Sequence, residues 1–405
     1  MKKLLCLVLA ICLACVIAAC GANVENESTG AESQQEVAEQ ENSSEVTEEN
    51  DLEEIVDSDS ETVDSNESIV EENTVEETPV VPARDLPDNK LVVQGLGPGV
   101  FGNAELEMSV LRTVTFLDTL ANVPAEAWDA SADGNGSVMA WLENGCDLYI
   151  AGEGGVTANE DCSFMFWDCY DLQQINFNDC FYTDNVTTML AMFSGCWSLE
   201  ALDVSSFKTS NCTEMGGMFN GLELVPELDV SGFDTSKVTY MANMFYDCRS
   251  LTKLDLTNFD TSNVTDMTHM FCNCVGLTEL DLSSFDTRKV ESFFQTFHGC
   301  ENLTTLDLGH FNTASCDDMC GMFQKCYNLE SVDISGFETG LVTRFNVMFS
   351  ECQKLTSVDV SHFDFSSAVE ADRMFKDSGV TDVGCTITVP EGCDDTEMFA
   401  NSPME

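Results

Sequence analysis

The feature that most constrains the fold is a Met-Phe pair that returns about every 26 residues. The Phe recurs at steps of 27, then 26 seven times, then 24 residues, and Met precedes it everywhere except at Phe297, where Thr296 takes its place. A period of 20–29 residues with apolar residues at fixed positions is typical of a solenoid in which each repeat forms one coil. The phenylalanines are Phe166, Phe193, Phe219, Phe245, Phe271, Phe297, Phe323, Phe349, Phe375 and Phe399.

Each repeat also carries a leucine pattern. Leu251, Leu254, Leu256 and Phe259 follow leucine-rich-repeat spacing, and the alternation across Asp255 predicts a short strand. In residues 261–271, a Ser or Thr can cap a helix whose apolar side chains share one face. The sequence therefore predicts an α/β solenoid, a leucine-rich-repeat array of about nine 26-residue turns, each a strand plus a short helix. At the strand spacing of ~4.8 Å such an array is roughly 40–45 Å long.

The phrase MFxxCxxLxxLDLSxFDTSxVTxM resembles the BspA-like leucine-rich-repeat surface proteins, also labelled DUF285. The resemblance covers roughly residues 165–375, and residues 116–156 are similar to the capping region that precedes such repeats. It implies a surface-exposed, non-enzymatic protein used in attachment or interaction with a host or neighbour, and it identifies no ligand. The chain departs from the pattern at Leu222, Ser378 and Thr296, which we interpret as core substitutions. We expect a small β-rich N-terminal capping region (84–163), repeats (164–378) and a C-terminal cap (379–405).

The first 20 residues have a basic start and an apolar run too short for a confident membrane span, which predicts an export signal. Small residues followed by Cys20 and Gly21 resemble a bacterial lipobox, which implies lipidation at Cys20. The alternative is an ordinary secretory signal that contains cysteine. Lipidation would anchor the protein to the membrane without spanning it and place it at the cell surface, outside the cytoplasm.

Residues 21–83 contain 21 Asp or Glu and no Lys or Arg, which predicts a disordered acidic stalk. About 60 such residues reach roughly 45 Å or more and would lift the repeats off the membrane. A metal-sequestering tail is the less favoured alternative. The whole chain has a net charge of -56, which argues against nucleic-acid binding.

Stacking brings equivalent residues into columns, and one column is acidic. Carboxylates ~4.8 Å apart repel by roughly 1 kcal/mol per neighbour even in water. Hydroxyls or turn N–H groups two residues further on can offset this repulsion, and we favour that structural account. The alternative is a row of weak Ca²⁺ sites. The outward acidic residues are Asp203, Asp229, Asp255, Asp281, Asp307, Asp333 and Asp359.

A second column consists of cysteines. In-register stacking keeps Cβ atoms near ~4.8 Å, further apart than a disulfide allows, so we interpret them as small buried thiols. Stronger disulfide candidates lie outside the column: Cys385 with Cys393, and Cys146 with Cys162. The column is Cys169, Cys196, Cys248, Cys274, Cys300, Cys326 and Cys352.

No motif for catalysis, a cofactor or a metal emerges. The four histidines, His269, His298, His310 and His362, form no recognised metal or nucleophile pattern. Residues 129–140 open like a calcium loop, but Ala140 replaces the final acid, so we predict a hairpin turn; residues 153–157 (GEGGV) predict another turn. Trp128, Trp141, Trp167 and Trp197 are expected to seal the first turns, with ligand contact as the alternative.

These observations predict a lipid-anchored, non-catalytic surface protein that mediates attachment or interaction with an unidentified extracellular protein or glycan. The outward strand positions carry no aromatic ladder, which favours weak or multivalent contact, or a site elsewhere on the array. Two alternatives remain: an envelope component that self-associates, and an envelope hydrolase with its site in residues 84–160.

Overall fold

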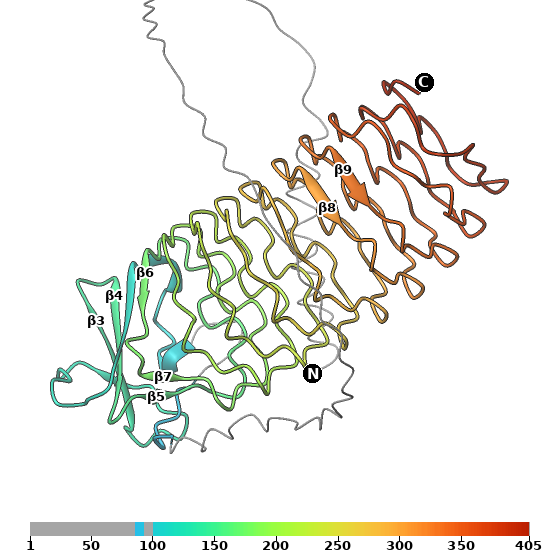
Figure 1. Ribbon diagram of the computed structural model, residues 1–405. Helices are drawn as coiled ribbons and strands as arrows, with labels where there is room; N and C mark the ends of the chain where they lie inside the picture. The colour runs from blue at the N-terminus through green and yellow to red at the C-terminus, as the bar shows by residue number, and fades with distance from the viewer. Residues whose placement is uncertain (1–85, 93–99, 405) are drawn as a thin grey trace, which may run out of the picture. The chain divides into compact units, whose positions relative to one another are not determined.

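The computed structural model describes residues 86–92 and 100–404 (Figure 1). Contacts divide the chain into two units, residues 1–79 and 80–405, and every described residue belongs to the second. The predicted signal peptide, Cys20 and the acidic stalk lie outside the described residues. Within the described part, no helix has the length and apolar character needed to cross a membrane.

The N-terminal part is a five-stranded sheet in the order β2-β3-β4-β1-β6. Strand β3 is antiparallel to β2 and β4, whereas β1 runs parallel to β4 and β6. Since β6 already belongs to the first coil, β1 continues the coil stack into the cap. The strands are β1 (Thr113–Leu117), β2 (Trp128–Asp129), β3 (Val138–Glu143), β4 (Asp147–Gly152) and β6 (Gln174–Asn176).

Short elements complete the described secondary structure. Two 3₁₀ helices, η1 (Val100–Gly102) and η2 (Met108–Val110), precede β1. Parallel pairs are formed by β5 (Val156–Thr157) with β7 (Phe181–Tyr182), and by β8 (Thr305–Asp307) with β9 (Ser331–Asp333).

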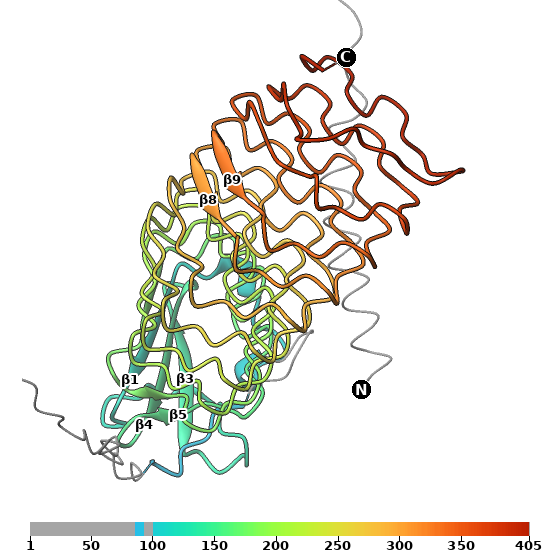
Figure 2. The same cartoon turned by 45° about the vertical axis from the view of Figure 1, so that its right-hand side comes forward.

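The coils stack in register along the array, as Figures 1 and 2 show. One unbroken column of parallel bridges joins each coil to the next, and its members are Asp161, Thr188, Glu214, Tyr240, Asp266, Ser292, Asp318, Arg344, Glu370 and Asp394. Among the described coils, the predicted leucine-pattern strand is regular at β6, β8 and β9, with single bridges such as Glu227 to Lys253 in other coils.

The prediction of a short helix in each repeat is wrong, because residues 261–273 form turns and no described repeat contains a helix. His269, Phe271 and Asn273 donate their N–H groups to the next coil, at Phe294, Thr296 and His298. An α-helix would direct those groups four residues back along its own chain. Positive φ angles at His269 (57°) and Asn273 (58°) interrupt helical geometry further.

The core contains one continuous column of phenylalanines, which confirms the prediction from the Met-Phe period. From Phe166 to Phe399, each ring stacks on the next at 5.3–6.1 Å between centroids and within 15° of parallel. Thr296 preserves the packing, because it is buried and its Oγ1 donates to Met267 O at 3.1 Å.

The cysteine column consists of buried free thiols, as predicted. Each of six donates to the carbonyl of the column phenylalanine in the preceding coil, at 3.0–3.2 Å. Burial raises the pKa of Cys300 and Cys352 to about 12, so these thiols stay protonated. The six donors are Cys196, Cys248, Cys274, Cys300, Cys326 and Cys352.

A column of buried threonines joins the coils at a second corner. Thr261 Oγ1 donates to Asp286 O at 3.0 Å and accepts from Asp286 N at 2.8 Å, so one hydroxyl satisfies both backbone groups of a residue in the next coil. All members repeat this pattern, and they are Thr183, Thr209, Thr235, Thr261, Thr287, Thr313 and Thr339.

Candidate interaction surfaces

The aspartate column lies on the outside of the array, and each carboxylate is engaged locally. Asp255 Oδ1 accepts from the N–H of Thr257 at 3.1 Å and from its hydroxyl at 2.7 Å. These bonds lower the pKa of Asp255. The other six accept the N–H two residues further on: Asp203, Asp229, Asp281, Asp307, Asp333 and Asp359.

This geometry provides the hydrogen bonds that our structural account of the acidic column requires. Each carboxylate acts as a turn acceptor that stabilises the backbone of its own coil. Within residues 86–92 and 100–404, no group of three or more His, Cys, Asp or Glu is placed to hold a metal ion.

A different surface, the turn face, is formed by the outward side chains of the segments that replace the expected helices. We define it by residues 240–246, 266–272, 292–298, 318–324 and 344–350. Except for Phe294, which is half-buried, the Met and Phe side chains of these segments are buried in the core, while the remaining positions differ from coil to coil. They include aromatic, histidine and arginine side chains that the strand positions lack.

Two histidines occupy neighbouring coils of the turn face. His269 is buried, its Nε2 lies 2.9 Å from Gln295 Oε1, and its ring packs edge-on against Tyr246 and Phe294. Burial lowers the pKa of His269, and it lowers the pKa of His298 to about 4. Both rings are therefore neutral near pH 7, so the two histidines add no charge to the turn face.

Arg344 supplies a positive charge beside Phe294. Its Nη1 lies 2.8 Å from Asp318 Oδ2 and its Nε lies 3.2 Å from Glu370 Oε2, so it bridges the preceding and following coils. Its guanidinium carbon lies 5.6 Å from the Phe294 ring centroid. The side chain remains 41% exposed, which leaves part of the guanidinium accessible to a ligand.

Buried polar atoms without a partner also occur on the turn face. Among the described residues, these side-chain atoms are Asn243 Oδ1, His298 Nδ1 and Asn346 Oδ1. An unpaired buried polar atom reduces stability by about 1–3 kcal/mol.

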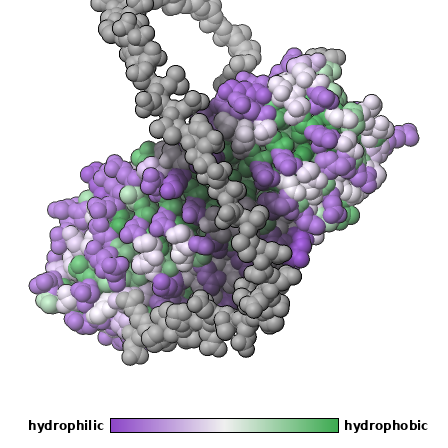
Figure 3. Space-filling view, in the orientation of Figure 1, coloured by the Kyte–Doolittle hydropathy of each residue, from purple (hydrophilic) through white to green (hydrophobic). Residues whose placement is uncertain are grey.

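The tryptophans do not form one cluster. Trp141 is buried and stacks on Tyr149, and Trp128 Nε1 donates to Phe101 O at 2.7 Å. These two contact residues of the cap and not of the first turns, whereas Trp167 is half-buried and packs edge-on against Phe164. Trp197, however, is 50% exposed and packs 4.5 Å from the Tyr170 ring, so it adds an aromatic contact surface near the first coils. Figure 3 shows the mixture of hydrophilic and hydrophobic residues on one face of the array.

The two predicted loops are turns. Asp129 Oδ1 and Oδ2 accept from Ser131 N and Gly136 N, which closes the hairpin between β2 and β3, and Ala140 is buried within β3. Residues 153–155 form the turn that connects β4 to β5, in which Gly155 N donates to Gly152 O, and residues 156–157 are β5 itself.

His310 and His362 belong to the fold rather than to a site. Their Nε2 atoms lie 3.1 Å and 3.0 Å from the carbonyl oxygens of Leu282 and Ile334, each in the preceding coil. Each ring therefore joins two neighbouring coils.

Neither predicted disulfide forms, since every described cysteine is free. Cys146 lies in the β3–β4 turn, whereas Cys162 begins the first coil and its N–H donates to Thr188 O in the next coil. The six residues of β4 carry the chain roughly 20 Å away from Cys146 before it reaches Cys162. Cys385 lines a cleft near the C-terminus. Cys393 follows a separate turn, in which its N–H donates to Pro390 O.

The in-register coils define this chain as a repeat solenoid. A family model described as "Mycoplasma protein of unknown function, DUF285" matches residues 160–280 and 272–383, more than half of the chain. The chain belongs to the DUF285 family, the BspA-like leucine-rich-repeat proteins.

Among solved structures, a leucine-rich-repeat protein from Bacteroides ovatus shares 15% identity with this chain. The similarity covers 63% of this chain and 83% of that one, with a TM-score of 0.24, which is too low to support an argument about this protein. No curated protein matches the chain.

Proposed function

We propose that this protein is a non-catalytic interaction protein of the cell surface that binds a protein or glycan through the turn face. The observation that carries the proposal is that some positions of each coil repeat along the array while others do not. The strand and corner positions hold hydrogen bonds that repeat from coil to coil, whereas His269, Phe294 and Arg344 interrupt the repetition.

The chemistry of the turn face suits recognition. Aromatic and arginine side chains are enriched where protein partners bind most strongly, and aromatic rings also stack on sugar faces. Neutral histidines can donate or accept one hydrogen bond without carrying a charge. His310 and His362 support a non-catalytic role because both are engaged in bonds between coils.

We also propose that lipidation at Cys20 anchors the protein and that residues 21–83 act as its spacer. Metabolic labelling with a fatty acid tests the anchor, because Cys20→Ser should abolish incorporation of the label. Incorporation that survives in the Cys20→Ser variant would contradict lipidation at this residue.

The binding experiment uses the full chain on arrays of extracellular matrix proteins and glycans. Phe294→Ala with Arg344→Ala should abolish the signals that the wild type gives. Lys253→Ala with Glu279→Ala, on the strand side, is the matched control and should bind normally. Circular dichroism verifies that both variants are folded. Equal binding by the two variants would exclude the turn face as the binding surface.

A further inference from the structure

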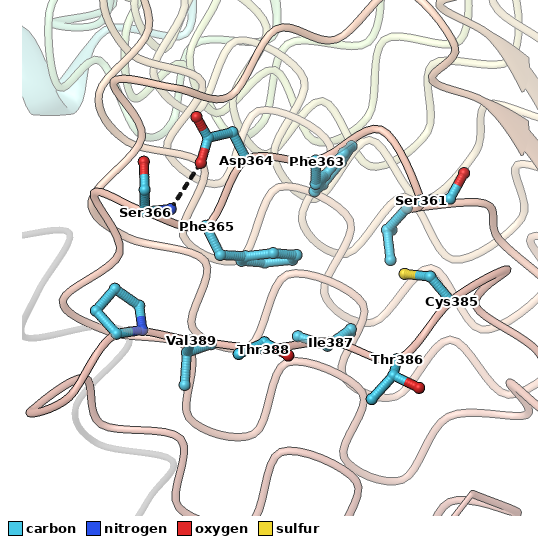
Figure 4. A pocket seen from close by; sticks show the side chains of 12 residues that line it. Ser361, Phe363, Asp364, Phe365, Ser366, Cys385, Thr386, Ile387, Thr388 and Val389 are labelled. Atoms are coloured by element: carbon cyan, nitrogen blue, oxygen red, sulfur yellow. Dashed lines mark hydrogen bonds between the residues drawn. The ribbon is translucent and has the colours of Figure 1, made fainter.

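The threonine column ends at the last full coil, and a cleft opens there. Phe365 occupies the next position of the column, where a hydroxyl would otherwise reach the following coil. The following segment, residues 384–390, contributes neither a phenylalanine nor a threonine to these columns. A cleft of about 570 Å³ lies between residues 360–366 and 385–390 (Figure 4).

The walls of this terminal cleft combine apolar side chains with Ser, Thr and Asp. Figure 4 shows the ring of Phe365 between the two segments, with Ile387 and Val389 on the opposite side. Phe363 and Phe365 are buried, whereas Ile387 and Val389 are half-buried. These side chains leave apolar surface open to a ligand that enters the cleft.

Residues 385–389 have the character of a strand without a partner. The alternating Thr386, Ile387, Thr388 and Val389 are β-branched, with the threonines exposed and the aliphatic residues half-buried. In the described part of the chain, no backbone hydrogen bond joins residues 385–389 to another segment. Unpaired backbone groups beside an apolar cleft form a template for an added strand.

The surroundings of the terminal cleft are acidic. Asp364 lines it, and none of its lining residues is Lys or Arg. Glu391 and Asp394 follow directly and are exposed, and Asp359 lies against Gly384, where a Cβ would come within 2.5 Å of Oδ1. A second copy of this chain, with its net charge of -56, would be repelled, whereas a basic segment would be attracted.

We propose that the terminal cleft binds an extended peptide segment of another protein, in which alternating apolar residues are flanked by Lys or Arg. The segment adds as a strand along residues 385–389. Its apolar side chains enter the cleft beside Phe365, and its basic ends face Asp364 and Glu391. This mode provides affinity through backbone hydrogen bonds and specificity through alternate side chains. The site is separate from the turn face.

The test uses the full chain and fluorescently labelled heptapeptides Lys-X-Thr-X-Thr-X-Lys, with X as Val, Ile or Phe. At least one should bind, with an affinity that falls as salt is raised. Replacing the central X by Pro, which removes a backbone donor, should raise Kd about tenfold or more. Replacing both Lys by Glu should abolish binding. The absence of binding by all three peptides, or equal binding by the Pro analogue, overturns the proposal.

Two variants locate the bound peptide. Ile387→Asp should abolish binding, and Phe294→Ala on the turn face should leave it unchanged. Hydrogen exchange, which also verifies folding, should show that the peptide slows exchange of the amides of residues 386–389. Protection confined to other residues overturns the proposal, as does sedimentation showing a dimer of the free chain that Ile387→Asp disrupts, since a second copy would then occupy the cleft.

Discussion

The threonine column makes a quantitative prediction about what holds neighbouring coils together. Thr261 is fully buried, and its hydroxyl satisfies both the N–H and the C=O of Asp286. Thr261→Val keeps the shape of the side chain and removes the hydroxyl, so both backbone groups lose their partner. At about 1–3 kcal/mol for each of the two buried unpaired groups, the loss is about 2–6 kcal/mol. Whole domains are stable by only about 5–15 kcal/mol, so this loss is readily measurable.

Thr261→Ser is the matched control, because it keeps the hydroxyl and deletes one methyl group at about 0.8 kcal/mol. Urea unfolding followed by circular dichroism should give the highest free energy of unfolding for the wild type, a slightly lower one for Thr261→Ser and the lowest for Thr261→Val. Since a repeat array need not unfold in one step, amide exchange at Asp286 supplies a local readout. It should accelerate in the Val variant and change little in the Ser variant. If Ser loses as much stability as Val, the methyl contact joins the coils and our reasoning about the hydroxyl is refuted.

Three further predictions concern protonation and ions. Iodoacetamide at pH 8 should label Cys385 in the folded protein and spare Cys300 and Cys352, whose pKa burial raises to about 12; labelling of either would contradict the buried column. The pKa of His298 is about 4 in the folded protein, below the ordinary 6.5, so stability present above pH 6.5 should be lost as pH falls toward 4, by about 3 kcal/mol. His298→Gln should reduce this dependence of stability on pH. If the variant and the wild type lose the same stability as pH falls, protonation of His298 is not the cause. Millimolar Ca²⁺ should leave Tm unchanged, because the column carboxylates already accept hydrogen bonds; a higher Tm would support cation sites.

The repeat period predicted the features that depend on register. A residue such as Phe271 packs on its own equivalents in the next coils, so the regular recurrence of Phe implies a stacked column. The same logic placed Cys274 in a buried corner as a free thiol. The hydrogen-bond donors to the acidic column could also be predicted, because Asp255 and Thr257 are two residues apart on a turn.

Local pattern alone misassigned the turn segments. Val264, Met267 and Phe271 satisfy helical spacing, but spacing does not say whether backbone N–H groups bond within the segment or to a neighbour. Here the next coil lies close enough to accept alternate N–H groups. Asn273 and its equivalents adopt the left-handed conformation that this arrangement requires. Interaction between coils therefore overrides the local preference for helix.

The repeating positions indicate the fold, but they do not indicate the function. A position repeats because its neighbours along the array must match it, as the hydroxyl of Thr261 must match the backbone of Asp286. A ligand is under no such constraint, and it can be recognised only where side chains are free to differ. Phe294 and Arg344 on the turn face, and Phe365 beside the terminal cleft, are such departures. In an array of this kind, candidate binding residues are therefore best sought where an outward position breaks the period, and each break then needs a contact that explains it.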